Sequence, residues 1–243
     1  MASSSPHAVQ RLIGMVRSPR ATLTSVVTKP RSLDLAVLVI AISVVCSAGF
    51  LMTRVGQLAA LDEQVRQLES FGAVITDDRY EELRRVVPYR PAISAALIIV
   101  GWPVLWVVLA RLIQGVGDRV MRLPRQSDED RARKRAQVLA VVVHAWAIIG
   151  VRAVVAAPIN YVRESLGGAT SLSVLLPGFG ASTFPARLMG TVDIFIVWWV
   201  VLMAMGVGIL YQTRTFSIAR WLFGAYLGIA AALALTQALR GGV

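Results

Sequence analysis

Three ionisable side chains, His144, Arg152 and Asp193, lie inside long apolar stretches of the sequence, where charge is costly and commonly marks a functional site. Arg152 lies five residues before Ala157, where one stretch ends. Asp193 lies five residues after Leu188, where the next stretch begins. If both stretches are antiparallel helices, the two side chains lie about 8 Å below the same boundary. The spacing therefore predicts an ion pair between Arg152 and Asp193.

Two roles are open to this pair. It is either a structural clamp between two helices or a polar site at which Arg152 or Asp193 exchanges an anion or a proton. His144 has no second histidine, acid or cysteine beside it at the spacing that metal ligands need. We therefore predict no metal site. We interpret His144 as hydrogen-bonded across helices, with a place in a proton relay as the alternative.

The sequence lacks the motifs on which soluble enzymes build their sites. It has no GxxxxGKS/T loop for phosphate. Gly178-x-Gly180 lacks the third glycine of a dinucleotide-binding loop, and Gly180-Ala-Ser-Thr-Phe184 lacks the last glycine of a nucleophile elbow. We predict no catalytic residue, no cofactor and no enzymatic activity.

Five apolar stretches are the elements that must position these side chains. Each has about 20 residues or more, the length at which a helix crosses the hydrocarbon core of a bilayer. Hydrophobic residues make up 56% of the chain, and the mean hydropathy is +0.64. The sequence predicts an all-α polytopic membrane protein with one five-helix transmembrane domain over residues 33–243. The predicted spans are 33–52, 91–113, 136–157, 188–211 and 216–239.

Residues 1–32 carry the pattern of short amphipathic helices. Ser5-Pro6 and Ser18-Pro19 are helix-start signals, and Lys29-Pro30 ends the pattern. We expect these helices to lie in the cytoplasmic headgroup layer or to pack on the bundle.

The connection after the first span, residues 53–90, also has a helical pattern. Its apolar residues recur every three or four positions, and a second helix start follows at Thr76. We predict that the first helix continues out of the membrane and forms an outer helical hairpin that ends at Pro88.

The basic residues set the predicted orientation. The formal net charge is +11, and residues 111–135 hold eight Lys or Arg whereas residues 158–187 hold two. Because cytoplasmic connections are enriched in Lys and Arg, we predict a cytoplasmic N-terminus and an outer C-terminus. The basic residues are spread over segments on both sides, so nucleic acid is not expected as a partner.

Small residues predict where helices approach closely. Gly224, Gly228 and Ala232 recur every four residues in the fifth span, and Ala204 and Gly208 do so in the fourth. Such stripes either pack helices within one bundle or form the face of a homo- or hetero-oligomer. The connection 158–187, rich in Pro and Gly, is the segment in which we expect a functional surface; the alternative is a loop resting on the outer face.

Five groups of residues follow one another in a recognisable order. They are Arg17-Ser18-Pro19 with Lys29-Pro30, His144-Ala-Trp-Ala-Ile, Pro158-Ile-Asn-Tyr-Val-Arg-Glu164, Asp193-Ile-Phe-Ile-Val-Trp-Trp199 with Gly206 and Gly208, and Ala225-Tyr226-Leu-Gly228. This order resembles the bacterial branch of the Yip1-domain membrane proteins. The resemblance implies a five-helix membrane bundle with a cytoplasmic N-terminus in a bacterial inner membrane. Asp34-Leu35 is followed by Ala36-Val37 rather than by the Tyr-Gly-Pro of eukaryotic members, so GTPase binding is not implied.

Two functions follow as hypotheses. The first is a non-enzymatic multi-pass membrane protein that organises the membrane or partner proteins. The alternative is a small transporter or lipid-handling protein that uses the polar site near Arg152 and Asp193.

Overall fold

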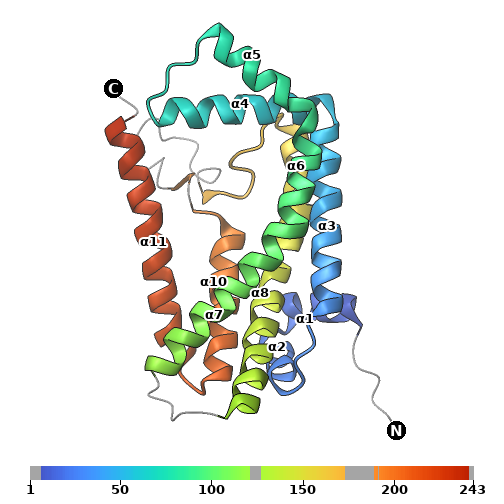
Figure 1. Ribbon diagram of the computed structural model, residues 1–243, viewed down its shortest axis with the longest axis vertical. Coiled ribbons are helices and arrows are strands. Elements are labelled where there is room, and N and C mark those ends of the chain that lie inside the picture. Colours follow the sequence, from blue (N-terminus) through green and yellow to red (C-terminus); the bar gives the residue numbers. More distant parts are fainter. Residues whose placement is uncertain (1–6, 121–126, 173–188, 191, 241–243) are drawn as a thin grey trace. The chain divides into compact units, whose positions relative to one another are not determined.

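The computed structural model describes residues 7–120, 127–172, 189–190 and 192–240. Within these residues the chain is helical, and an isolated β-bridge pairs Ser171 with Asp193. Figure 1 labels the helices in chain order. They are α1 (Ala8–Arg17), α2 (Pro19–Thr28), α3 (Leu33–Met52), α4 (Arg54–Ser70), α5 (Asp77–Val86), the 3-10 turn η1 (Val87–Tyr89), α6 (Arg90–Ala96), the π-helical segment η2 (Leu97–Gly101), α7 (Trp102–Val120), α8 (Asp128–Val162), α10 (Ile194–Leu210) and α11 (Thr215–Arg240). The predicted helical class is confirmed for the described residues.

Within the described part of the chain, four helical runs are long and apolar enough to cross a membrane. They are Leu33–Met52, Asp77–Arg119, Asp128–Val162 and Thr215–Leu233. The fourth predicted span contains a shorter apolar helix, Ile194–Leu210, of 17 residues. A helix of this length is about 26 Å long, close to the lower limit for crossing a bilayer.

The chain divides into two compact units. The first comprises residues 1–42, 98–151 and 198–222, and the second comprises residues 43–97, 152–197 and 223–243. Each boundary between consecutive segments falls within one of the five apolar stretches of the sequence. The chain therefore passes from one unit to the other five times.

The core of the first unit is built around the middle of α8. Val138, Val141 and His144 are fully buried there, and Gly206 of α10 lies beside both Val141 of this helix and Leu23 of α2. A Cβ added to Gly206 would lie 2.4 Å from the side chain of Val141. Four tryptophan rings extend this core, with centroids 5.5–6.3 Å apart: Trp102, Trp106, Trp146 and Trp199.

Both N-terminal helices bury apolar residues, and α1 also exposes some. In α2, Leu23 and Val26 are buried in the first unit. In α1, Met15 is buried and Val9 and Ile13 are exposed, while the guanidinium of Arg11 is buried and bonds to the carboxylate of Asp34. The exposed apolar residues of α1 are of the kind expected for a helix in a headgroup layer.

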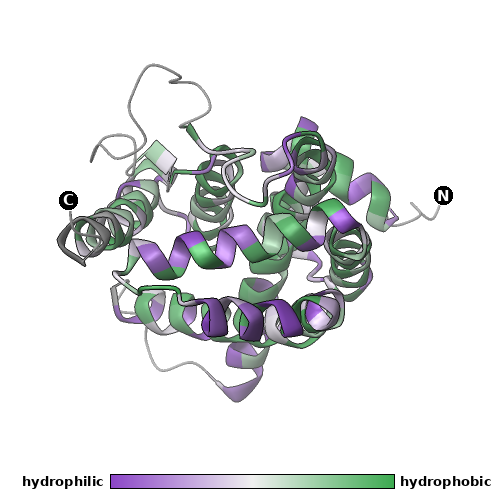
Figure 2. Cartoon of the chain, turned by 90° about the horizontal axis from the view of Figure 1, so that it is seen from above, coloured by the Kyte–Doolittle hydropathy of each residue, from purple (hydrophilic) through white to green (hydrophobic). Residues whose placement is uncertain are grey.

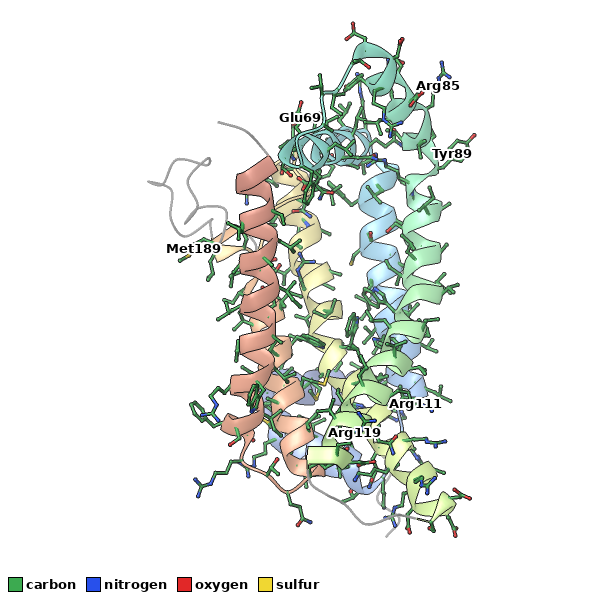
Figure 3. The ribbon with its side chains drawn as sticks, turned by 60° about the vertical axis from the view of Figure 1, so that its left-hand side comes forward. Glu69, Arg85, Tyr89, Arg111, Arg119 and Met189 are labelled. Atoms are coloured by element: carbon green, nitrogen blue, oxygen red, sulfur yellow. The ribbon has the colours of Figure 1, made fainter. Side chains whose placement is uncertain are left out.

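In the second unit, α4 and α5 form the predicted hairpin. Leu61 of α4 packs against Leu83 of α5 and Val87 of η1. Arg90 donates to the carbonyl of Ala60 at 2.6 Å, which fixes the return of the chain into α6. Figure 2 shows hydrophilic and hydrophobic residues alternating along the two hairpin helices. Figure 3 labels Glu69 of α4, Arg85 of α5 and Tyr89 of η1, all of which are exposed.

The prediction that the first helix continues into the hairpin is wrong. The predicted span 33–52 coincides with α3, but Thr53 has an extended backbone and caps a new helix. Its hydroxyl donates to the carbonyl of Phe50 at 2.7 Å and accepts from the amide of Gly56 at 3.0 Å. One side chain thus satisfies the end of one helix and the start of the next.

The third span also extends beyond its predicted bounds. We predicted 136–157, whereas α8 begins at Asp128 and continues through Pro158 to Val162. Asp128, Glu129 and Asp130 occupy the first turn, where carboxylates are favoured by the helix dipole. The second span, predicted to end at Ile113, likewise continues to Val120.

Candidate functional site

We predicted that Asp193 lies inside a helix. In the structure it lies immediately before α10. Its Oδ1 accepts from the amides of Phe195 at 2.8 Å and Ile196 at 3.4 Å. These are the second and third residues of α10, so Asp193 has the contacts of an N-cap. The predicted helix start at Leu188 lies outside the described residues.

Arg152 approaches the other carboxylate oxygen. Its Nε donates to Oδ2 of Asp193 at 2.7 Å, so the structure brings the two predicted partners together. The hydroxyl of Thr170 donates to the same Oδ2. The side chain of Asp193 is 14% exposed and that of Arg152 is 41% exposed, so the carboxylate is the enclosed member of the pair.

The backbone around Asp193 is also hydrogen-bonded. The amide of Ile194 donates to the carbonyl of Thr170 at 3.0 Å, and the amide of Leu172 donates to the carbonyl of Val192 at 2.8 Å. The amide of Asp193 donates to the hydroxyl of Tyr226, from α11, at 3.3 Å. Sequence reasoning did not assign Thr170 or Tyr226 to this site, because no periodic pattern places a hydroxyl from a loop or from a distant helix beside a helix start.

These contacts favour the structural role of the pair. An ionised carboxylate offers about four lone-pair sites, and Asp193 receives four donors from the described residues: two amides, one hydroxyl and one guanidinium NH. They join α8, the loop at Thr170 and the start of α10.

His144 is fully buried, and its hydrogen bond lies within its own helix rather than across helices. Nδ1 is 2.7 Å from the carbonyl of Ala140, one turn earlier in α8. Since a carbonyl only accepts, Nδ1 carries the proton. Nε2 has no hydrogen-bond partner among the described residues. The interpretation of a bond across helices is therefore wrong.

A second polar cluster joins three elements of the first unit. Asp118 of α7 accepts from Lys134 of α8 at 2.8 Å and from the hydroxyl of Tyr211, which directly follows α10, at 3.2 Å. The ammonium of Lys134 also lies 4.4 Å from the centroid of the Tyr211 ring. The charges of this cluster are thus satisfied within the chain, as at Asp193.

The two small-residue stripes have different surroundings. In α10, Ala204 and Gly208 are buried, and a Cβ on Gly208 would lie 3.1 Å from the hydroxyl of Thr215. In α11, a Cβ added to Gly224 or Gly228 would meet nothing within 4 Å. The stripe of α10 therefore serves packing within the chain, whereas that of α11, with Ala232, is exposed.

Two hollows in the first unit could receive apolar groups. A groove of about 590 Å³ runs between α7, α10 and α11, with Leu112, Val207 and Trp221 among its walls. A smaller pocket of about 180 Å³ lies between α7 and α8 and is lined by Arg111 and Arg135. Neither hollow is lined by Arg152 or Asp193.

Comparison with known proteins does not identify a function, so a function has to be argued from the residues of the chain itself. No family model matches the chain, and no curated protein or solved structure matches it. Among the described residues, no group of three or more His, Cys, Asp or Glu is placed to hold a metal ion. The middle of the connection 158–187, where we expected a functional surface, lies outside the described residues from 173 onward.

Proposed function

We propose that this chain is a non-enzymatic, multi-pass membrane protein of Yip1 type that crosses a bacterial inner membrane five times and organises partner proteins there. The observation that carries the proposal is the set of apolar helices: within the described residues, four helical runs are long and apolar enough to cross a membrane, and the shorter apolar helix Ile194–Leu210 lies in the remaining apolar stretch. In support, the enclosed carboxylates Asp193 and Asp118 are committed to contacts within the chain.

The distribution of basic residues supports the predicted topology. Residues 111–135 hold eight Lys or Arg and residues 158–187 hold two, and these two connections lie on opposite sides when all five apolar stretches cross the membrane. With the more basic side in the cytoplasm, the N-terminus is inside and the C-terminus is outside.

Reporter fusions test this topology. A cytoplasm-active reporter placed at residue 124 is expected to be active, and the same reporter placed after Ser70 or after Val243 is expected to be inactive. A reporter active only outside should give the reverse pattern. Cytoplasmic activity of the reporter after Val243 would show that both termini lie on the same side, and would contradict five crossings.

The exposed stripe of α11 is the face we assign to partners. In a Cys46→Ala background, which removes the sole cysteine, Gly228→Cys is expected to form a disulfide with the same position of a second copy when an oxidant is added to native membranes. Ile229→Cys, on a neighbouring exposed position, is the matched control and is expected to crosslink less. Gly224→Leu should reduce the product of Gly228→Cys without destabilising the chain itself, because a Cβ at this position would meet no atom of another element within 4 Å.

Two results would contradict the partner face. One is the absence of any crosslinked product from Gly228→Cys. The other is equal crosslinking at Ile229→Cys, since random collisions do not distinguish adjacent positions of one helix.

A lipid-handling role is the second candidate, favoured by the apolar groove between α7, α10 and α11. Its volume of about 590 Å³ lies within the range of ~300–1,000 Å³ that holds small-molecule ligands. Transfer of labelled lipid between vesicles containing the protein tests this role, and a rate equal to that of protein-free vesicles would exclude it.

A further inference from the structure

The pocket between α7 and α8 combines two cations with apolar walls. Arg111 comes from α7 and Arg135 from α8, and Gln114 adds an amide one turn along α7. The walls include Val107, Ala110 and Leu139. Among the described residues, no carboxylate lines the pocket. A group bound here would therefore meet positive charge at one part of its surface and hydrocarbon at another.

The positions of the two arginines in the sequence place this pocket at a membrane boundary. Arg111 lies two residues before Ile113, the predicted end of the second span, and Arg135 directly precedes Ala136, the predicted start of the third. Both ends belong to the same side in the proposed topology. The two guanidinium groups thus lie at headgroup level, and Figure 3 shows Arg111 toward the end of α7 that also carries Arg119.

Both guanidinium groups are available to a ligand. Neither forms an ion pair within the described part of the chain. Asp118, the nearest acid along the same side of α7, is already held by Lys134 at 2.8 Å and by Tyr211 at 3.2 Å. Positive charge that is not neutralised by the protein favours an anion at this place.

We propose that this pocket binds the phosphate of an anionic diacyl phospholipid from the leaflet on the N-terminal side. Arg111 and Arg135 bind the phosphate oxygens, which match the paired donors of a guanidinium. Gln114 lies where its amide can donate a further bond, and an acyl chain lies along Val107 and Leu139. Basic pockets between transmembrane helices are places where anionic headgroups bind. The pocket, at about 180 Å³, has room for several groups of water size, each about 30 Å³.

The source of the phosphate follows from the apolar walls. A free phosphate ion would gain nothing from Val107, Ala110 or Leu139, whereas a lipid that already stands in the leaflet presents its acyl chain to them. The inference rests on the proposed membrane position of α7 and α8. The reporter fusions test that position separately, so a chain of correct topology without lipid preference would contradict this site alone.

Binding is measured on the purified full chain in mild detergent by native mass spectrometry, with phosphatidylglycerol and phosphatidylcholine as probes. The wild type is expected to retain one phosphatidylglycerol and to bind phosphatidylcholine more weakly. Arg111→Gln with Arg135→Gln should weaken phosphatidylglycerol binding about 30-fold, from about 1 kcal/mol for each basic residue near an anionic headgroup. Arg119→Gln with Arg220→Gln, which removes the same charge outside the pocket, is the matched control and should change it little.

Four outcomes overturn the proposal. They are equal binding of the two lipids by the wild type, equal losses in the pocket and control variants, displacement of the lipid by inorganic phosphate at the lipid's own affinity, and occupation of the pocket by a second copy of the chain. If the glutamine pair fails to fold, Arg111→Lys with Arg135→Lys gives the answer. It keeps the charge but loses the paired donors, so unchanged binding would also overturn the site.

Discussion

Replacement of Asp193 by alanine is expected to destabilise the protein by about 3 kcal/mol. The substitution removes the N-cap of α10, which costs about 1 kcal/mol. It also removes the hydrogen bonds that the carboxylate accepts from Arg152 and Thr170. Each bond to a charged acceptor contributes about 1.5–3 kcal/mol in soluble proteins and about 0.6 kcal/mol on average between membrane helices. Asp193→Asn should cost less, because its amide oxygen still accepts from Phe195 and Ile196. The measurement is the free energy of unfolding in mixed detergent–SDS micelles.

A double-mutant cycle separates the clamp from the cap. Arg152→Ala alone is expected to cost only about 1 kcal/mol, since the three other donors to the carboxylate of Asp193 remain. If the two side chains interact, the double variant Arg152→Ala, Asp193→Ala should cost less than the two single losses together, by about 1 kcal/mol. Strict additivity would mean that the contact contributes nothing to stability.

The lengths of the apolar runs made most of the helical architecture predictable. The first span coincides with α3 because hydrocarbon-length runs of apolar residues, bounded by polar ones, specify both ends of a helix. The Arg152–Asp193 contact was predictable from equal depth on successive spans. Its wider network was not, because Thr170 reaches Asp193 from an irregular connection whose path no periodicity encodes.

The hydropathy pattern did not show where α10 and α4 begin. The run through residues 188–211 is apolar on both sides of Asp193, so composition alone placed this residue inside a helix. Its type carried the missing signal, since an aspartate before an apolar run is a preferred N-cap. Thr53 carries the same signal before α4, and there the pattern of apolar residues continued across the break.

The second large effect on stability is expected at the corner between α3 and α4, at Thr53. In the second unit, α3 ends at Met52 and α4 begins at Arg54, and Figure 1 shows α4 running across the direction of α3. Gly56 lies inside this corner. A Cβ added to it would lie 2.0 Å from the carbonyl oxygen of Phe50 and 3.1 Å from the Cα of Leu51. Both are backbone atoms, so a side-chain rotation cannot relieve the overlap.

Gly56→Ala is therefore expected to destabilise the protein by about 3 kcal/mol, at the upper end of the range for overpacked sites. The overlap outweighs the gain of up to about 1 kcal/mol that alanine brings to a helix. Gly49→Ala, in α3, is the matched control. Its Cβ would meet nothing within 4 Å, so the helical gain should remain and stability should rise or stay unchanged. The free energy of unfolding in mixed micelles measures both variants. Equal effects of the two substitutions would show that the close approach of α4 to the end of α3 does not hold the hairpin in place.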